Sequence, residues 1–520
     1  LIALASVPVT RYKLAGYVIK KTLGVTVVDS VTGKPISGAS VSYGGHQATT
    51  NATGQALLAA PLGGGELSIT KGYYQPYSKT TTIGIGDPSP ALKISLVATG
   101  RQVSLTILNK LTKEPVTGAI VKVLETSAVT NKAGEVSIVL PTKTDTVTAT
   151  ITAEGYTTST AEVQVTDGVV PANTISIVPA GKLYFLSTAN GTQDVVKTNL
   201  DGSDRSVVLA GTGKEDAATS QLIASRDWRY VVVKTRRTAT ETSLYLIDTA
   251  TDKQTQFEAT NSAYNLIGWS GHNFVYDVVR STVAASQSGR ESIKSYNADQ
   301  QQLNQLDQTQ ALGAAASYAA LTFSNFFIVD NQLLYTTKWT GGGDTAYDLS
   351  SQTNSIRTIS VSGQGKKDLQ SYPAATFAGI QTAHVLPGRV IYLVASTDGA
   401  ATYYSYTGGS LSADTSLNPD SFAQPSPVYL PSPDGLKTAW STVSGKPGLM
   451  VGDKNGSNPT SVSGGEYGAY GWYGSKYILL SRGGSSLYIL PLGEGKNYTP
   501  TKVGDYSQQQ IAPASYGGGF

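Results

Sequence analysis

The sequence predicts an all-β protein of several domains, and three observations support this prediction. Short apolar stretches alternate with Gly, Pro, Asn and Asp turns along the whole chain, which is typical of antiparallel sheets. One unit occurs twice in the first third of the chain, and another recurs through the rest. The 520 residues are ample for several hydrophobic cores. We therefore expect two small tandem β-domains followed by a larger domain of repeats.

The composition limits the classes of function. Charged residues make up 14% of the chain, below the ~25% of an average soluble protein. The net charge of +3 comes without a basic block, which argues against nucleic-acid binding. The chain has no Cys, so it has no disulfide, thiol nucleophile or thiolate metal site. We predict an extracytoplasmic protein, cell-surface or extracellular, that is anchored or assembled through its N-terminus.

Residues 1–21 form an apolar and basic N-terminal segment. The stretch LIALASVPV at Leu1–Val9 precedes Arg11 and Lys13, and is shorter than the ~20 residues that span a bilayer. Three interpretations stay open: the remnant of a membrane anchor or export signal, a strand that assembles on a neighbouring subunit, or a strand packed on its own chain. The residues that would make this contact are Leu1, Ile2, Leu4, Val7, Val9, Tyr12 and Leu14.

Residues 22–98 and 99–178 are two copies of one β-domain. Gly38-Ala39 recurs as Gly118-Ala119, an offset of 80 residues, and Thr50-Asn51-x-x-Gly54 recurs as Thr130-Asn131-x-x-Gly134. The Pro-(Ile/Val)-x-Gly-Ala segment, the T-N-x-x-G turn and a late Gly-Tyr resemble the carboxypeptidase-regulatory-like and PEGA-type β-sandwich modules. This resemblance implies two tandem Ig-like β-sandwiches, which serve mostly as spacers, stalks or adhesive units.

The remainder, residues 179–520, repeats a unit whose clearest copy is LPSPDGLKTAWSTVSGKPGLMVGDKNGSNPTSV at Leu430–Val462. A Ser-Pro-Asp-Gly turn leads into a short strand, and Asp453–Asn458 forms a hairpin between two further strands. Worn copies begin at Leu183, Ala224, Asn265, Asn325, Thr382 and Gly468.

This repeat resembles a blade of the TolB-type β-propeller family. The spacing of ~40–50 residues implies about seven blades. The first copy lacks an inner strand, and the C-terminal segment Gln510–Gly517 is expected to supply it and close the ring. The whole arrangement resembles bacterial surface proteins with regulatory-like repeats and a TolB-like propeller.

Candidate residues for chemistry are few. His46, His272 and His384 have no second His or carboxylate at a ligand-like spacing, so we expect structural or surface roles and no metal site. There is no Gly-x-Ser-x-Gly elbow. Asp453, Asn455 and Ser457 have the oxygen spacing of a calcium loop but no closing Glu, which favours a plain hairpin. Gly341–Asp344 lacks the Lys-Ser/Thr of a phosphate-binding loop.

Tyrosine and tryptophan mark possible contact surfaces. Such aromatics are enriched at protein contacts and stack on sugars, although sheet packing is the simpler interpretation. The candidates are Tyr403, Tyr404, Tyr406, Tyr467, Tyr470, Trp472 and Tyr473.

Three hypotheses follow for function. The first is a non-enzymatic structural or adhesive surface protein, a sandwich stalk carrying a propeller head, which assembles into a filament or multimer through residues 1–21. Its partners would be other subunits, surface proteins or copies of itself. The second is a membrane-anchored module that binds a protein, peptide or glycan at the propeller channel. The third, an enzyme, needs converging carboxylates, for which Asp227, Asp277, Asp330 and Asp434 are candidates. We predict no enzyme activity and no cofactor.

Overall fold

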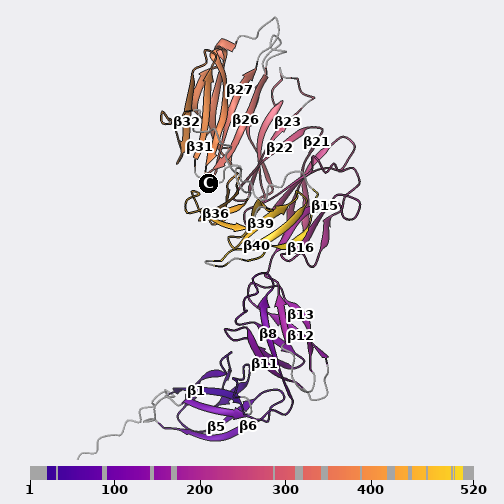
Figure 1. Cartoon of the computed structure of the whole chain (residues 1–520), viewed down its shortest axis with the longest axis vertical. Helices are drawn as coiled ribbons and strands as arrows, with labels where there is room; N and C mark the ends of the chain where they lie inside the picture. The colour runs from indigo at the N-terminus through magenta and orange to yellow at the C-terminus, as the bar shows by residue number, and fades with distance from the viewer. Residues whose placement is uncertain are drawn as a thin grey trace, which may run out of the picture. The chain divides into compact units, whose positions relative to one another are not determined.

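The computed structural model describes residues 20–507 except 31–32, 85–90, 141–145, 166–172, 281, 285–286, 311–319, 341–348, 387–388, 419–427, 443–447, 464–465, 494–495 and 497. The chain divides into two compact units, Leu1–Gly181 (unit 1) and Lys182–Phe520 (unit 2). Strands form both units, and the described part contains no α-helix (Figure 1). The all-β prediction is confirmed. The predicted domains 1–21, 22–98 and 99–178 all fall in unit 1, and 179–520 begins just before unit 2.

The first half of unit 1 packs two sheets around one core, in the orders β3-β2-β5-β6 and β4-β1-β7. Alternate residues of β4 are exposed and buried, so Ala56, Leu58 and Ala60 enter the core. β1 pairs antiparallel with β4 and parallel with β7. The strands are β1 (Lys20–Asp29), β2 (Ser40–Tyr43), β3 (His46–Thr49), β4 (Gln55–Pro61), β5 (Gly63–Thr70), β6 (Tyr77–Ile83) and β7 (Ala91–Leu96).

The second half repeats this arrangement strand for strand, in the orders β10-β9-β12-β13 and β11-β8-β14. β8 pairs antiparallel with β11 and parallel with β14, as β1 does with β4 and β7. The strands are β8 (Arg101–Asn109), β9 (Ile120–Val123), β10 (Thr126–Val129), β11 (Glu135–Leu140), β12 (Thr146–Thr152), β13 (Ser159–Gln164) and β14 (Asn173–Ile177).

The T-N-x-x-G motif ties one loop of each half to another. The buried Thr50 Oγ1 donates to Ile36 O at 2.7 Å and accepts from Ala39 N–H at 2.8 Å. Thr130 makes the same pair of bonds in the second half. Gly54 has φ +74°, and a Cβ there would lie 2.5 Å from Val27 O, so only glycine fits the turn. The motif is therefore a structural signature of the repeat.

Unit 2 holds seven antiparallel sheets within the described residues, and each is named here by its first and last strand. The first three sheets comprise β15 (Lys182–Ser187), β16 (Asp194–Asn199), β17 (Ser206–Leu209); β18 (Gln221–Ala224), β19 (Tyr230–Arg236), β20 (Thr242–Asp248), β21 (Lys253–Thr260); and β22 (Ala263–Ser270), β23 (Asn273–Val279), β24 (Glu291–Asn297), β25 (Gln302–Gln308).

The other four sheets have four strands each. They comprise β26 (Ala320–Val329), β27 (Gln332–Thr340), β28 (Thr353–Ser360), β29 (Lys367–Pro373); β30 (Phe377–Leu386), β31 (Arg389–Ser396), β32 (Ala401–Thr407), β33 (Ser410–Ala413); β34 (Leu430–Pro431), β35 (Lys437–Ser441), β36 (Leu449–Asp453), β37 (Thr460–Ser463); and β38 (Gly468–Tyr473), β39 (Tyr477–Arg482), β40 (Ser486–Pro491), β41 (Thr501–Asp505). Two 3-10 turns cover Leu349–Ser351 and Ala374–Thr376.

The end of the described chain returns to the first sheet of unit 2. Sheet β15–β17 has three strands, and β15 lies at its edge. Beyond β41, Ser507 N–H donates to Leu186 O of β15 at 2.9 Å, and Gln193 Nε2 donates to Ser507 O at 2.6 Å. The predicted closing strand Gln510–Gly517 lies outside the described residues.

Buried acids tie neighbouring sheets of unit 2 together. Glu258 on β21 accepts from Tyr276 Oη at 3.0 Å and pairs with Lys294, both in the next sheet. Asp307 on β25 likewise accepts from Tyr335 Oη at 2.6 Å and Arg357 at 3.0 Å. In each case the tyrosine and the cation face each other across the second and third strands of their sheet. The same arrangement, an acid that binds a tyrosine and a cation of the next sheet, therefore recurs at two successive interfaces between sheets.

Candidate functional site

Of the two predicted sets of contact residues, the structure describes only the aromatic set. Leu1, Ile2, Leu4, Val7, Val9, Tyr12 and Leu14 lie outside the described residues, so their role stays a prediction. Among the aromatics, Tyr403, Tyr406, Tyr470 and Trp472 are buried, and Tyr404, Tyr467 and Tyr473 are half-buried. Trp472 is 1% exposed and donates through Nε1 to Leu430 O at 2.7 Å. For the buried four, packing within the sheets accounts for the aromatic side chain.

The structure brings one histidine together with two carboxylates. His272 lies in the turn between β22 and β23, with Nδ1 2.8 Å from Asp299 Oδ2 and Nε2 2.9 Å from Asp227 Oδ2. Asp299 lies in the β24–β25 turn of the same sheet, and Asp227 lies in the β18–β19 turn of the preceding sheet. A protonated imidazole donates to both acids at once. We call Asp227, His272 and Asp299 the Asp–His–Asp cluster.

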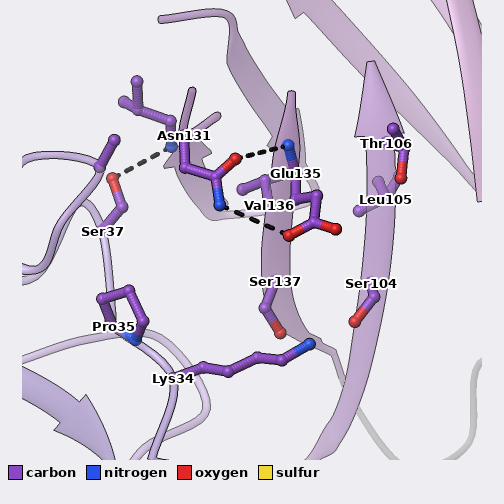
Figure 2. A pocket seen from close by; sticks show the side chains of 12 residues that line it. Lys34, Pro35, Ser37, Ser104, Leu105, Thr106, Asn131, Glu135, Val136 and Ser137 are labelled. Carbon is purple, nitrogen blue, oxygen red and sulfur yellow. Dashed lines mark hydrogen bonds between the residues drawn. The ribbon is translucent and has the colours of Figure 1, made fainter. Parts of the chain in front are cut away.

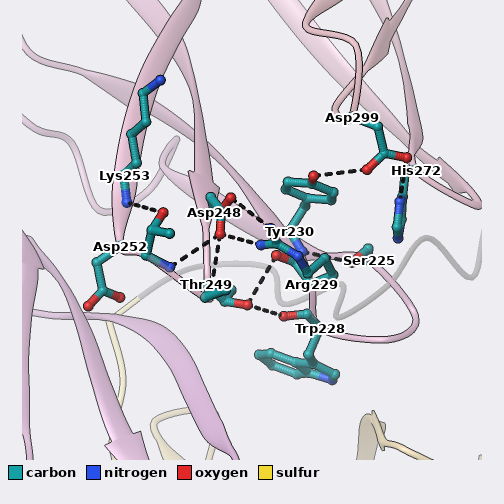
Figure 3. Close-up of polar contacts among 12 residues, drawn as sticks. Ser225, Trp228, Arg229, Tyr230, Asp248, Thr249, Asp252, Lys253, His272 and Asp299 are labelled. Atoms are coloured by element: carbon teal, nitrogen blue, oxygen red, sulfur yellow. Dashed lines mark hydrogen bonds and ion pairs between the residues drawn. The ribbon is translucent and has the colours of Figure 1, made fainter.

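Neighbouring side chains hold the cluster in place (Figure 3). Tyr230 Oη donates to Asp299 Oδ1 at 2.9 Å, and its ring meets the imidazole edge-on with centroids 5.0 Å apart. Arg229 stacks over Tyr230 and binds Asp248 through both terminal nitrogens. The side chains of Asp227 and Asp299 are nevertheless 54% exposed, against 30% for His272. The cluster is therefore ordered and open to solvent.

The turn that carries Asp227 explains its fixed orientation. The buried Ser225 Oγ donates to Asp227 Oδ1 at 2.6 Å and accepts from Tyr230 N–H at 3.0 Å. Ser432 makes the same two bonds to Asp434 and Lys437 N–H in sheet β34–β37. The Ser-x-Asp part of the predicted blade turn thus fixes the turn locally. Asp434 is the counterpart of Asp227, and its carboxylate accepts from Ser432 Oγ and Leu436 N–H.

The imidazole and the two carboxylates favour one another's charged forms. Burial alone would lower the pKa of His272, but hydrogen bonds and charge from both acids outweigh burial and raise it. Burial would raise the pKa of Asp227, but hydrogen bonds from Ser225 and His272 lower it. The hydrogen bond from His272 is the main reason that the pKa of Asp299 is lowered. An imidazolium between two carboxylates leaves the cluster with a net negative charge.

A second pair of acids lies buried in the same sheet. Asp277 on β23 is 3% exposed, and its Oδ1 has no hydrogen-bond partner. Glu291 on β24 accepts from Phe323 N–H at 3.0 Å. Burial, with the charge of Glu291, raises the pKa of Asp277 to about 8. Burial raises the pKa of Glu291 to about 7. The charge that acts on Asp277 is that of Glu291, and the hydrogen bond from Val278 N–H opposes the rise in pKa only in part.

Within the described residues, the four candidate acids named from the sequence do not converge on one another. Asp227, Asp277, Asp330 and Asp434 belong to four different sheets. No group of three or more His, Cys, Asp or Glu side chains there could hold a metal ion. The oxygens of Asp453 and Asn455 accept from Ser457 and Asn458 within their own hairpin. Gly341–Asp344 lies outside the described part.

A cavity of about 410 Å³ lies between the two halves of unit 1 (Figure 2). Lys34 reaches into it toward Ser104 and Ser137, and on its wall Asn131 Oδ1 accepts from Glu135 N–H at 3.0 Å. Its walls combine apolar side chains with hydroxyl and amide groups and two opposite charges, Lys34 and Glu135, and they hold no cluster of titratable groups. The lining residues are Lys34, Pro35, Ser37, Ala52, Ser104, Leu105, Thr106, Val129, Asn131, Glu135, Val136 and Ser137.

In the described part of the chain, no helix has the length and apolar character needed to cross a membrane.

Comparison with known proteins gives remote structural likenesses. No protein-family model and no curated protein matches the chain. An oligogalacturonate lyase from Vibrio parahaemolyticus is 11% identical over 60% of this chain and 87% of its own, with a TM-score of 0.36. The β-propeller domain of the Trilobed protease from Pyrococcus furiosus is 8% identical over 70% and 96%, with a TM-score of 0.36. TolB from Acinetobacter baumannii is 11% identical over 65% and 82%, with a TM-score of 0.29.

These comparisons correct one prediction. The prediction that the chain is not an enzyme is wrong as a conclusion from this architecture, because solved structures similar to it include a lyase and several peptidases. The absence of a Gly-x-Ser-x-Gly elbow excluded only one type of catalytic site. All of these TM-scores lie below 0.5, so the likeness transfers no activity to this chain.

Proposed function

We propose that the chain is an extracytoplasmic surface protein in which two Ig-like β-sandwiches carry a partner-binding β-propeller head. The repeated sheet order in the two halves of unit 1 supports the tandem sandwiches. The low content of charged residues, 14% of the chain, supports a location outside the cytoplasm. Because a fold alone does not determine function, the carrier role of the sandwich pair is itself part of this proposal.

In this proposal unit 2 is a ring of seven blades closed by the C-terminal segment. Seven successive sheets in the described part support the blade number. The three-stranded first sheet and the hydrogen bond from Ser507 to Leu186 support the closure, because the chain arrives at the open edge of β15. Closure of this kind removes exposed sheet edges and gives a rigid platform for loops.

The partner binds at the Asp–His–Asp cluster, and the observation that carries this proposal is the pair of half-exposed, ionised carboxylates held in fixed positions. Asp227 is fixed by Ser225, and Asp299 is fixed by Tyr230. Binding residues are commonly found on loops that a rigid scaffold positions. Because the acids are fixed before binding, little conformational entropy is lost on contact.

The chemistry of the cluster selects a cationic partner group. Two carboxylates on either side of one imidazole accept hydrogen bonds from a guanidinium or ammonium group of a peptide or protein. Such a cation competes with the imidazolium of His272 for the same oxygens. Affinity therefore rises with pH as His272 loses its proton, through a pKa that lies above 6.5.

The test is a titration of the full chain with fluorescently labelled peptides rich in arginine, in lysine or in glutamate, followed by anisotropy. We expect the cationic peptides to bind and the acidic peptide not to bind. Asp227→Asn and Asp299→Asn should each weaken binding by roughly threefold to tenfold, as expected for exposed ion pairs.

The matched control is Asp434→Asn, which changes the same Ser-x-Asp turn in another sheet. It should leave peptide affinity unchanged. Equal binding of acidic and cationic peptides, or an equal loss of affinity in the control, would contradict the proposed site.

A further inference from the structure

The two halves of unit 1 repeat each other, but the first half covers the outer face of one sheet in the second half. The loop containing Lys34, Pro35 and Ser37 faces β8 and β11 across the cavity in Figure 2. Ser37 Oγ accepts from Val129 N–H, on the edge strand β10, at 3.1 Å. Val139 of β11 is buried in the core of the first half. A loop of one half therefore docks on sheet β11-β8-β14 of the other.

The corresponding face of the first half, on sheet β4-β1-β7, is open. Leu57 takes the place of Ser137, 80 residues earlier in the chain, and is 71% exposed. Gly24, in the place of Ser104, lies directly opposite Leu57 on β1. A glycine inside a strand permits close approach of another backbone. Thr49 and Gln55, in the places of Val129 and Glu135, are also exposed.

The docking loop also has a second copy, in the second half of unit 1. Pro115, Thr117 and Lys132 occupy the places of Pro35, Ser37 and Ala52, and all three are exposed. Thr117 keeps the hydroxyl that in Ser37 accepts a backbone N–H. In the contact within unit 1, Lys34 lies on the loop and Glu135 on the sheet face. The second copy has Glu114 in place of Lys34, and the open face has the uncharged Gln55 in place of Glu135. Glu114 therefore meets no like charge at that position.

We infer that a second copy of this chain docks residues 114–117 and 132 of its second sandwich on the Leu57 face of the first. The contact between chains repeats the contact that unit 1 already makes within itself. Leu57 is buried on binding, and Thr117 Oγ1 accepts from Thr49 N–H as Ser37 accepts from Val129. Because the two surfaces differ, the contact is heterologous and builds head-to-tail rings or open chains of molecules.

The test is sedimentation of the full chain over a wide range of concentration. The wild-type chain should associate as concentration rises, and both Leu57→Glu and Thr117→Lys should raise the concentration needed at least tenfold. Leu303→Glu is the matched control, because Leu303 is an exposed leucine on a strand of unit 2. The control should associate like the wild type.

Mixing the two variants separates head-to-tail contact from other association. Each variant keeps one intact surface, so an equimolar mixture should form dimers and no larger species, and each variant alone should stay monomeric. A wild-type chain that is monomeric at every concentration overturns the inference. A mixture of the two variants that remains monomeric, or association that Leu57→Glu leaves unchanged, also overturns it.

Discussion

The two ends of sheet β22–β25 hold carboxyl groups in opposite circumstances. At one end, Asp299 meets the imidazole of His272 together with Asp227 from the neighbouring sheet, and the pKa of both acids is lowered. At the other end, Asp277 and Glu291 lie buried near each other, and their pKa values are raised to about 8 and about 7. The carboxylates of the first set are charged and half-exposed, whereas in the second set Asp277 is mostly protonated at neutral pH and Glu291 is close to its midpoint.

The comparison teaches that a positive partner, more than burial, decides the charge of an acid here. Asp307 faces Ile293 across the strand pair, as Asp277 does from the other side, and it is also buried. Burial would raise the pKa of Asp307, but the hydrogen bond from Tyr335 and the charges of Lys366 and Arg357 lower it. Similarly buried neighbours on one sheet thus differ in charge because one has cations.

The largest expected effect comes from removing a cation from Asp307. Arg357→Met leaves that buried carboxylate with the half-exposed Lys366 as its cation beside the hydrogen bond from Tyr335, and should cost about 3–5 kcal/mol of unfolding free energy. All five tryptophans lie in unit 2, so tryptophan fluorescence in denaturant reports on that unit alone.

Lys366→Met is the matched control for this change. The Lys366 ammonium contacts the other oxygen of Asp307 at 3.0 Å, but its side chain is 48% exposed. It should cost at most about 1 kcal/mol. Equal costs for the two substitutions would show that burial of the cation is irrelevant.

The next largest expected effect concerns Asp277, the buried acid that has a raised pKa. The pKa of Asp277 is raised from 3.8 to about 8, so the folded state holds a proton that the unfolded state has lost. Its contribution to stability is complete below pH 3.8 and declines as the pH rises to about 8. Asp277→Asn removes this decline, and should stabilise unit 2 at pH 9 by a few kcal/mol relative to the wild type.

The measurement is the denaturant midpoint of both proteins between pH 5 and pH 9. The difference between them should grow with pH and level off above about 8. If wild type and variant keep a constant difference across this range, the raised pKa of Asp277 is refuted.

The smallest effect concerns His272. Its pKa is raised, so the stability it contributes is complete below pH 6.5 and is lost as the pH rises through the folded value. His272→Gln should cost at most about 1 kcal/mol at pH 6, because the acids around it are exposed to solvent. The cost should fall as the pH is raised to 9. A cost that increases with pH would reverse the proposed sign.

The sequence predicted the local units and missed how they meet. The T-N-x-x-G and Ser-x-Asp motifs are visible because their hydrogen bonds join residues close in the chain, as Ser225 and Asp227 do. His272 has no carboxylate at a ligand-like spacing in the sequence, and its partners Asp299 and Asp227 are 27 and 45 residues away. These contacts depend on which turns share one end of adjacent sheets, and residue spacing alone does not encode that.

For the aromatics the sequence favoured sheet packing but left a contact surface open. Tyr470, Trp472 and Tyr473 lie among glycines near turn signals, so the pattern alone did not say which of them are buried. The structure places them on β38, where Trp472 enters the core shared with sheet β34–β37. Asp227 was named as a candidate acid, but its partner His272 was not linked to it, since no pattern joins two different repeats.

The most direct test of this account is an NMR titration of the full chain with isotope-labelled histidine. The chain contains only three histidines, and His272→Gln identifies the signal of His272. The account predicts that His272 titrates above 6.5 and that Asp227→Asn and Asp299→Asn each move its pKa downward. A wild-type His272 that titrates at or below 6.5, or that ignores both substitutions, would contradict it.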